Sequence, residues 1–157
     1  MTADLDLDGY LPYLLNRAGA RIATAFTGVA RDYGITLPMW RVLAVLNHHG
    51  ALRVGALARL TTIDVSTLSR VLDGMERKGL VARRRGGGDQ RSVTVETRPA
   101  GRDLTAKVIP VAHHYEDVAL AGFDAAEARA LKAMLIRLFE NLDRLDDERR
   151  AEQRDAG

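Results

Sequence analysis

The stretch from residue 52 to residue 98 constrains the fold more than any other part of this chain, because its hydrophobic pattern changes period partway along. Up to Gly79, apolar residues recur every three or four positions, which is the spacing of an amphipathic helix. From Leu80 onward the pattern is that of short strands, and the sequence RRRGGGDQR joins two of them. Short helices that run into a β-hairpin are therefore the expected centre of the fold.

The helical half of this stretch predicts two helices joined by a tight turn. The first covers about residues 53–60, and Thr61-Thr62-Ile63 make the connection. Asp64 can cap the second helix, and Gly79 supplies the left-handed residue that ends it. The second helix is expected to bury its apolar residues Val65, Leu68, Val71, Leu72 and Met75. This is the helix-turn-helix pattern, in which the second helix enters the major groove of DNA.

The second half of the stretch predicts a hairpin. Residues 80–84 and 92–97 have the composition and alternation of strands. Residues 86–89, Gly-Gly-Gly-Asp, are too flexible for regular structure and suit the tip between the strands. A helix-turn-helix followed by such a hairpin is a winged helix-turn-helix.

Long helices are predicted on both sides of this winged region. Residues 9–33 carry one apolar stripe, and Asp8 is the expected N-cap of that helix. A further helix begins after Pro99, and Asp124 with Glu127 forms a capping box for the last one. The expected fold class is therefore mainly α with a minor β part.

The expected organisation is a DNA-binding region at residues 36–97, opened by a helix from Thr36 to Gly50, within a single compact domain. Residues 1–35 and 98–157 form a helical dimerisation region, because long apolar stripes at both ends of the chain need a partner surface. Packing against a second copy would supply that surface. A monomeric helical bundle that covers the winged region is the alternative.

Positive charge is concentrated in the middle of the chain. Residues 51–98 hold ten Lys and Arg against five Asp and Glu, whereas residues 99–157 hold nine against twelve. This distribution suits a surface that faces a polyanion, and chance bias on a solvated face is the alternative. There is no cysteine, no long apolar run and no signal-peptide core at the N-terminus. We therefore expect a soluble, cytoplasmic protein without a membrane partner.

The exposed N-terminal face of the second helix carries the candidate reading residues Ser66, Thr67, Ser69 and Arg70. Ser and Thr can reach phosphates or base edges, and Arg70 can bind guanine or a phosphate through two parallel hydrogen bonds. Local roles are the alternative. Ser66 and Thr67 can help to cap the helix at Asp64, and Arg70 can pair with Asp73.

The wing carries a second set of candidates. Arg83, Arg84 and Arg85 lead to the tip, and Asp89 stands two residues before Arg91. Residues two apart on a strand share a face, so Asp89 can orient the Arg91 guanidinium toward a narrow minor groove. A phosphate-cradling glycine loop is the alternative, but the required spacing and the following helix are missing.

The run DVSTLSRVLDGMERKGLVARR, followed by DQRSVTVETRPAG and flanked by long helices, resembles the MarR family of winged-helix transcription regulators. The element DQRS, at Asp89 to Ser92, matches the family's D-x-R-S/T signature, and the likeness covers residues 9–145. The resemblance implies a homodimer joined through its N- and C-terminal helices. It also implies binding to a pseudo-palindromic operator on double-stranded DNA, usually as a repressor that a small ligand releases.

The resemblance carries over to single residues of this sequence. It implies that the second helix lies in the major groove, that Arg91, steadied by Asp89, lies at the wing tip, and that Gln90 lies near phosphates there. The DNA-binding residues expected in this way are Ser66, Thr67, Ser69, Arg70, Arg85, Asp89, Gln90 and Arg91. Because cysteine is absent, the peroxide-sensing thiol used by some members is not available.

Family ligands, often phenolic or other aromatic anions, imply a cleft between the helical and winged regions. The candidate lining residues are Arg21, Trp40, His48 and Tyr115. Core packing is the alternative role for Trp40 and Tyr115, and solvation or ion pairing is the alternative for Arg21.

No catalytic group, cofactor or metal site is predicted. His48-His49 and His113-His114 are adjacent pairs, and neighbours on a helix point about 100° apart, so each pair offers one ligand to a given site. Neither a Ser/His/Asp arrangement nor a phosphate loop is present, which argues against an enzyme. The remaining alternative to a DNA-binding regulator is a winged-helix protein-interaction module that does not bind DNA.

Overall fold

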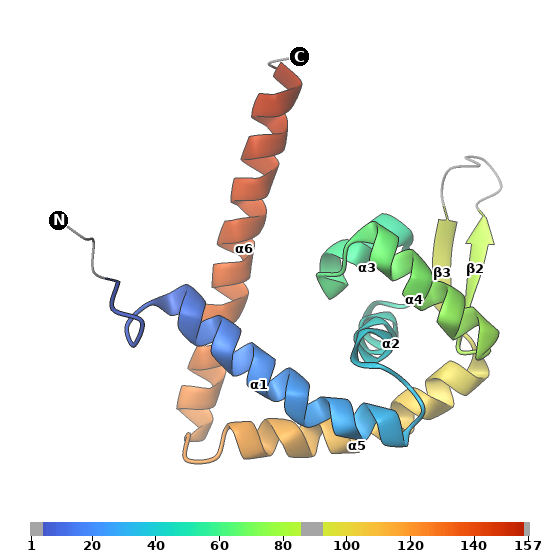
Figure 1. The fold of residues 1–157 in the computed structure, drawn as a ribbon, viewed down its shortest axis with the longest axis horizontal. Helices are drawn as coiled ribbons and strands as arrows, with labels where there is room; N and C mark the ends of the chain where they lie inside the picture. The colour runs from blue at the N-terminus through green and yellow to red at the C-terminus, as the bar shows by residue number, and fades with distance from the viewer. Residues whose placement is uncertain (1–4, 86–92, 156–157) are drawn as a thin grey trace. The chain divides into compact units, whose positions relative to one another are not determined.

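The computed structural model describes residues 5–85 and 93–155, with side chains as far as residue 145 (Figure 1). Helices dominate, and short strands form one antiparallel sheet, so the predicted mainly α fold with a winged helix-turn-helix is confirmed. Within the described ranges, no helix has both the length and the apolar character needed to cross a membrane. The elements in chain order are α1 (Leu11–Asp32), α2 (Leu37–His49), β1 (Leu52–Arg53), α3 (Val54–Thr61), α4 (Val65–Arg77), β2 (Val81–Arg85), β3 (Val93–Thr97), α5 (Pro99–Ala119) and α6 (Ala125–Asp155).

The chain divides into two compact units, Met1–Glu116 and Asp117–Gly157. The first contains α1 to β3 and most of α5, and the second contains the end of α5 and the whole of α6. The partition into a DNA-binding region at residues 36–97 and a flanking dimerisation region stays a prediction.

Polar side chains cap the first turns of α2 and α4, and the cap at Asp64 of α4 was predicted. The Met39 N–H donates to Thr36 Oγ1 at 3.4 Å, and the Thr67 N–H donates to Asp64 Oδ1 at 2.8 Å. Each bond satisfies one of the backbone donors that the first turn of a helix leaves unpaired. Gly79, with a φ of +68°, follows the end of α4 in the left-handed conformation that favours glycine.

The outer helices begin in different ways. At α6 the Glu127 N–H donates to Asp124 Oδ1 at 2.8 Å and the Asp124 N–H donates to Glu127 Oε2 at 2.9 Å, which is the predicted capping box. The prediction of Asp8 as the N-cap of α1 was wrong, because the N-cap is Tyr10, without a side-chain hydrogen bond. Pro12 lies in the first turn of α1, where its missing N–H needs no partner.

The sheet has the strand order β1-β3-β2, and both pairings are antiparallel. β2 and β3 form the wing, and each begins one residue later than predicted, at Val81 and Val93. The sequence analysis missed β1, because two residues are too few to show an alternating pattern. In β1, Leu52 pairs with Val95 and joins the helix-turn-helix to the wing.

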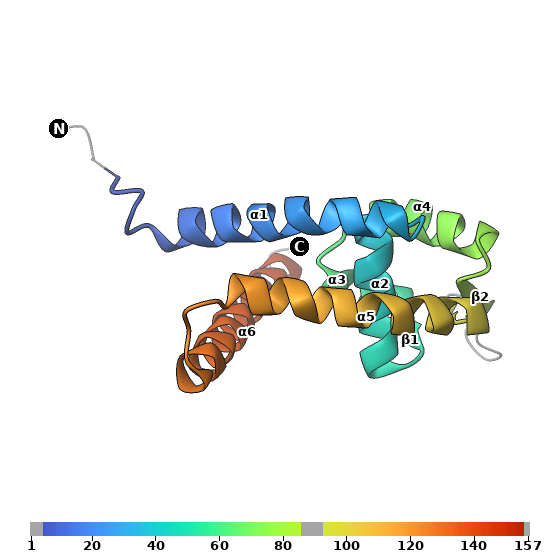
Figure 2. The same ribbon diagram turned by 90° about the horizontal axis from the view of Figure 1, so that it is seen from below.

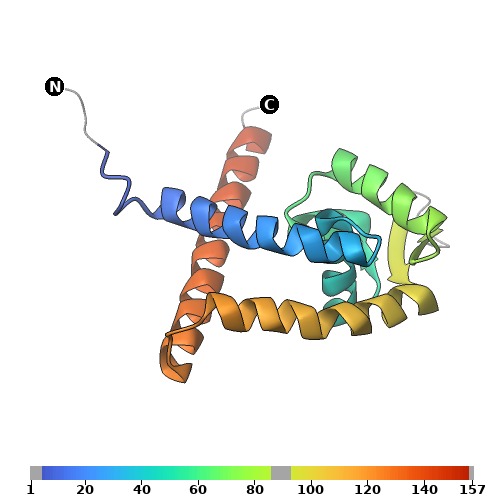
Figure 3. The same ribbon diagram turned by 60° about the horizontal axis from the view of Figure 1, so that its bottom comes forward.

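The core of the first unit surrounds α2, which Figures 2 and 3 show between α1, α5 and the helix-turn-helix. Of the residues predicted to be buried on α4, Val71 is partly buried and Val65 is 56% exposed. Val65, the more exposed of the two, is the first residue of α4, one turn before Leu68, and its side chain lines an open groove instead of the core. The largest fully buried side chains are Val42, Leu43, Leu57, Leu68, Leu72, Met75, Val81, Val95, Thr105 and Val108.

A close backbone contact fixes the start of α5 against the end of the helix-turn-helix. The Leu80 carbonyl accepts a hydrogen bond from the Arg98 N–H at 2.9 Å. Gly101 is packed against the same oxygen, and a Cβ at this position would lie 2.1 Å from it. Only glycine fits this approach, so the direction in which α5 leaves the wing depends on residue 101.

Candidate nucleic-acid interface

The predicted reading residues lie together on one exposed face of α4. This face is opposite the side that buries Leu68, Leu72 and Met75 against the core. The residues on it are Ser66, Thr67, Ser69 and Arg70, all of which are exposed. One face of α4 therefore packs against the core, and the opposite face exposes polar and basic side chains.

Asp64 organises the first turn of α4. The Ser66 hydroxyl donates to Asp64 Oδ1 at 2.6 Å, and the Thr67 N–H donates to the same oxygen at 2.8 Å. Hydrogen bonds from the Ser66 side chain, and then from the side chain and backbone of Thr67, hold the pKa of the Asp64 carboxyl well below its usual range. The local capping contact that the sequence offered as an alternative for Ser66 is thus formed.

Arg70 has neither an ion pair nor a hydrogen bond among the described residues. The pair between Arg70 and Asp73, which was the alternative interpretation of the sequence, does not form, because Asp73 is bound by Arg83. The Arg70 guanidinium on this exposed face is therefore free to bind an acceptor from outside the protein.

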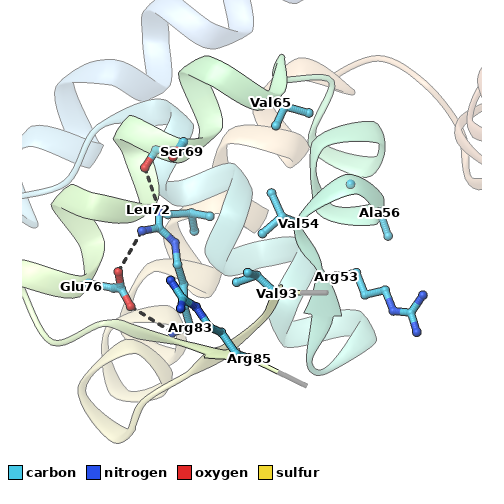
Figure 4. A pocket seen from close by; sticks show the side chains of 11 residues that line it. Arg53, Val54, Ala56, Val65, Ser69, Leu72, Glu76, Arg83, Arg85 and Val93 are labelled. Atoms are coloured by element: carbon cyan, nitrogen blue, oxygen red, sulfur yellow. Dashed lines mark hydrogen bonds and ion pairs between the residues drawn. The ribbon is translucent and has the colours of Figure 1, made fainter. Parts of the chain in front are cut away.

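Arg83 connects the wing to α4. Its Nη1 lies 2.6 Å from Asp73 Oδ1 and 3.1 Å from Glu76 Oε2, and its Nη2 donates to the Ser69 carbonyl at 2.8 Å (Figure 4). The Arg83 N–H also donates to Glu76 Oε1 at 3.0 Å. The side chain is only 24% exposed, so this group positions the wing and is not available as a surface cation.

Arg83 was not distinguished from its neighbours by sequence, although the alternation of strand faces places it on a different face from Arg84. Arg84 points to the other face of β2 and pairs with Glu96 of β3, with 2.6 Å between Nε and Oε1. Arg85, the last described residue of β2, is exposed. The basic run thus contains three arginines in three different environments.

A groove of about 780 Å³ separates α4 from the wing (Figure 4). Arg85 lines it on the wing side and Ser69 on the α4 side. Arg53, at the end of β1, is an exposed cation of the same groove that the sequence analysis missed. No motif marked it, because its position depends on the pairing of β1 with β3.

The expected wing-tip residues Asp89, Gln90 and Arg91 lie outside the described residues, as do Gly86 to Gly88. Their roles stay predictions. The described strands end at Arg85 and resume at Val93, and these two residues are paired in the antiparallel register.

None of the four candidate ligand-pocket residues lines the groove between α4 and the wing. Trp40 and Tyr115 both pack against the buried Phe26, and their ring centroids lie 5.6 Å and 5.8 Å from the Phe26 centroid. Both are partly buried against the core, as their alternative role requires. Arg21 is exposed on α1, and His48 is exposed near the end of α2, next to His49.

The histidines lie apart from the α4 surface. His113 Nδ1 is 3.5 Å from Glu116 Oε2 on α5, and the His48 and His49 rings contact each other at 4.6 Å between centroids. In the part of the chain that the structure describes, no three His, Cys, Asp or Glu side chains are grouped so that they could hold a metal ion.

Comparison with known proteins connects this geometry to one group of regulators. A family model described as the MarR family matches residues 35–93, which extend from just before α2 to the first residue of β3. A helix-turn-helix transcriptional repressor of Mycobacterium bovis is 30% identical over 83% of this chain and 94% of its own length.

Solved structures match the fold over most of the chain. A MarR-family regulator from Silicibacter pomeroyi superposes with a TM-score of 0.80 at 33% identity, covering 90% of this chain and 95% of that one. BpsR of Bordetella bronchiseptica superposes with a TM-score of 0.74 at 27% identity, covering 82% and 97%. For BpsR, the structure concerns the regulation of DNA binding by 6-hydroxynicotinic acid.

Proposed function

The chain belongs to the MarR family of transcriptional regulators, and from this premise we propose that it is a homodimeric repressor that binds a pseudo-palindromic operator and is released by a small aromatic ligand. In this proposal α4 lies in the major groove and the wing reaches the adjacent minor groove. Ser69 and Arg70 are the main reading residues, with Ser66 and Thr67 beside them.

The observation that carries the proposal is the state of Arg70. Among the described residues, Arg70 has no partner and lies exposed on the face of α4 that the core leaves free, while Asp73, the nearest carboxylate along the helix, is bound by Arg83. A guanidinium is suited to guanine and to phosphate because its donors match pairs of acceptor oxygens or the O6 and N7 atoms of the base. Arg53 and Arg85 add positive charge across the groove.

The homodimer is supported by exposed apolar side chains on the outer helices. A stable helix of this kind normally buries its apolar stripe, and a second copy of the chain would cover it. On α1 the large apolar residues exposed by 40% or more are Leu11, Leu14 and Ile22, and on α6, in the other unit, they are Met134, Leu135, Ile136, Phe139, Leu142 and Leu145. The expected dimer would place two α4 helices about one DNA turn apart, some 34–36 Å.

Release by a ligand is supported by the likeness to BpsR, whose DNA binding 6-hydroxynicotinic acid regulates. An aromatic carboxylate is therefore the ligand class to test first. Arg21, Trp40, His48 and Tyr115 remain the candidate pocket, although Trp40 and Tyr115 already pack against the core. The 157 residues contain no cysteine, so they cannot form a sensor based on thiol oxidation.

Electrophoretic mobility shift with the duplex that flanks its own gene tests the proposal. We expect a saturable complex that resists non-specific competitor DNA and weakens steeply with salt, because each neutralised phosphate releases condensed counterions. Absence of such a complex at low salt would contradict the proposed function. A complex that competitor removes completely would reduce the function to non-specific DNA binding.

A further inference from the structure

Val65 is an exposed apolar residue at the start of the helix that carries the candidate reading face. Its relative exposure is 56%, whereas Leu68 and Leu72 of the same helix are fully buried. A lone exposed valine needs no explanation in a soluble protein. Val65 differs because Val54, the first residue of α3, and Val93, the first residue of β3, line the same groove, so that its lining has an apolar part (Figure 4).

The position of Val65 relates it to the reading residues. Val65 and Ser69 are four positions apart, so they are neighbours one turn apart on α4, and both line the groove. Arg53, Arg85 and the acidic Glu76 line the same groove, so apolar and charged side chains both contribute to it. If α4 lies in the major groove, Val65 is at the end of the helix that approaches the base edges.

The chemistry of the major groove restricts what Val65 can recognise. Base edges there present hydrogen-bond donors and acceptors, and the apolar group among them is the 5-methyl group of thymine. A valine side chain has no polar atom and can contribute only by contact with that methyl group. The neighbouring Ser66 hydroxyl is already bonded to Asp64 at 2.6 Å and does not compete for the position.

We infer that Val65, with Val54 beside it, receives the 5-methyl group of one thymine in each half-site and is a specificity-determining residue. The inference rests on the proposed function, because it requires α4 to read the major groove. It adds the preferred base and the chemical group of that base which the protein detects.

The test begins with selection of preferred duplexes from a randomised library by the wild-type protein. Each thymine of the selected half-site is then replaced singly by deoxyuridine, which removes the 5-methyl group and keeps the base pair. Binding is measured by fluorescence anisotropy. At one thymine we expect about four-fold weaker binding, which corresponds to the burial of one methyl group at about 0.8 kcal/mol. Replacement of each of the other thymines by deoxyuridine is the control and should change the binding affinity little.

Variants at residue 65 assign the effect to this side chain. Val65→Ala should bind the thymine duplex about as weakly as the wild type binds the uracil duplex, and should lose the difference between the two. Val65→Thr keeps one of the two methyl groups and should retain part of the difference. Because Val65 is exposed at the first position of α4, circular dichroism should give unchanged melting temperatures.

Three results would overturn the inference while leaving the proposed function intact: a selected half-site without thymine, wild-type binding that is insensitive to uracil at every thymine, or full uracil sensitivity in Val65→Ala. If the selection yields no preferred sequence at all, the proposed function itself fails, and the inference fails with it.

Discussion

Arg83 Nη1 lies 2.6 Å from Asp73 Oδ1, and this ion pair joins wing strand β2 to α4. Contacts of the same guanidinium with Glu76 and the Ser69 carbonyl extend the connection over two turns of the helix. Arg83 therefore adds a polar connection between the wing and α4 to the core packing of Val81 and Val95. In the proposed function, the orientation of the wing relative to α4 decides whether the two can bind adjacent grooves together.

Replacing Arg83 tests this positioning role. Arg83→Ala should lower the free energy of unfolding by about 1–3 kcal/mol, because it leaves charged acceptors without their donor. Operator affinity should fall as well, since the wing loses its polar connection to α4. Chemical denaturation and anisotropy measure the two effects.

Arg84→Ala is the matched control for Arg83→Ala, because Arg84 is the next residue, is 74% exposed and pairs with the single carboxylate of Glu96. We expect it to change stability by roughly 0–1 kcal/mol. Equal destabilisation by the two variants would contradict the special role of Arg83.

Gly101 is expected to tolerate no side chain. Gly101→Ala would place a Cβ 2.1 Å from the Leu80 carbonyl oxygen, and should destabilise the protein by about 1–3 kcal/mol or more. Gly28→Ala, in α1, is the control, because a Cβ there has open space within 4 Å. It should stabilise the helix by roughly 0.5–1 kcal/mol. If the melting temperatures of both variants shift in the same direction, the close contact between Gly101 and the Leu80 carbonyl is refuted.

The cap of α4 should make stability depend on pH. Hydrogen bonds from Ser66 and Thr67 lower the folded-state pKa of Asp64, so its contribution is fully present above the unfolded-state pKa of about 3.9 and is lost as pH falls toward the lower folded value. Asp64→Ala should lower the melting temperature at pH 7, and its difference from wild type should shrink below about pH 4.

Asp64→Asn separates capping from charge in the same experiment, because Asn keeps the hydrogen-bond acceptor and does not titrate. We expect it to retain most of the stability at pH 7. A constant difference between Asp64→Ala and wild type from pH 7 down to pH 2 would show that the titration of Asp64 does not contribute.

Local signals made much of the fold predictable. The caps at Asp64 and Asp124 and the left-handed Gly79 depend on a few neighbouring residues, and the structure confirms each of them. Asp8 failed as a cap although its residue type was suitable, because α1 begins after Tyr10, near Pro12.

Contacts between elements were less predictable. The pair between Arg83 and Asp73 spans ten positions and depends on how the wing folds back on α4. Val65 fits the apolar period of its helix, but it lies beyond the edge of the core, and periodicity gives no information on where a core ends. The exposure of the α4 face was therefore predictable, whereas the place of Arg53 in the groove beside it was not, because it depends on the pairing of β1 with β3.

The central claim, that α4 reads DNA through its exposed face, is tested most directly by the dissociation constants of wild type and Arg70→Ala for a selected duplex and a scrambled duplex. We predict that wild type prefers the selected duplex and that Arg70→Ala weakens its binding about ten-fold or more, because a bidentate base contact is worth about 1–3 kcal/mol. Arg137→Ala, on α6, removes the same charge and should bind as wild type does. If Arg70→Ala binds both duplexes as tightly as wild type, Arg70 does not read DNA and the claim is contradicted.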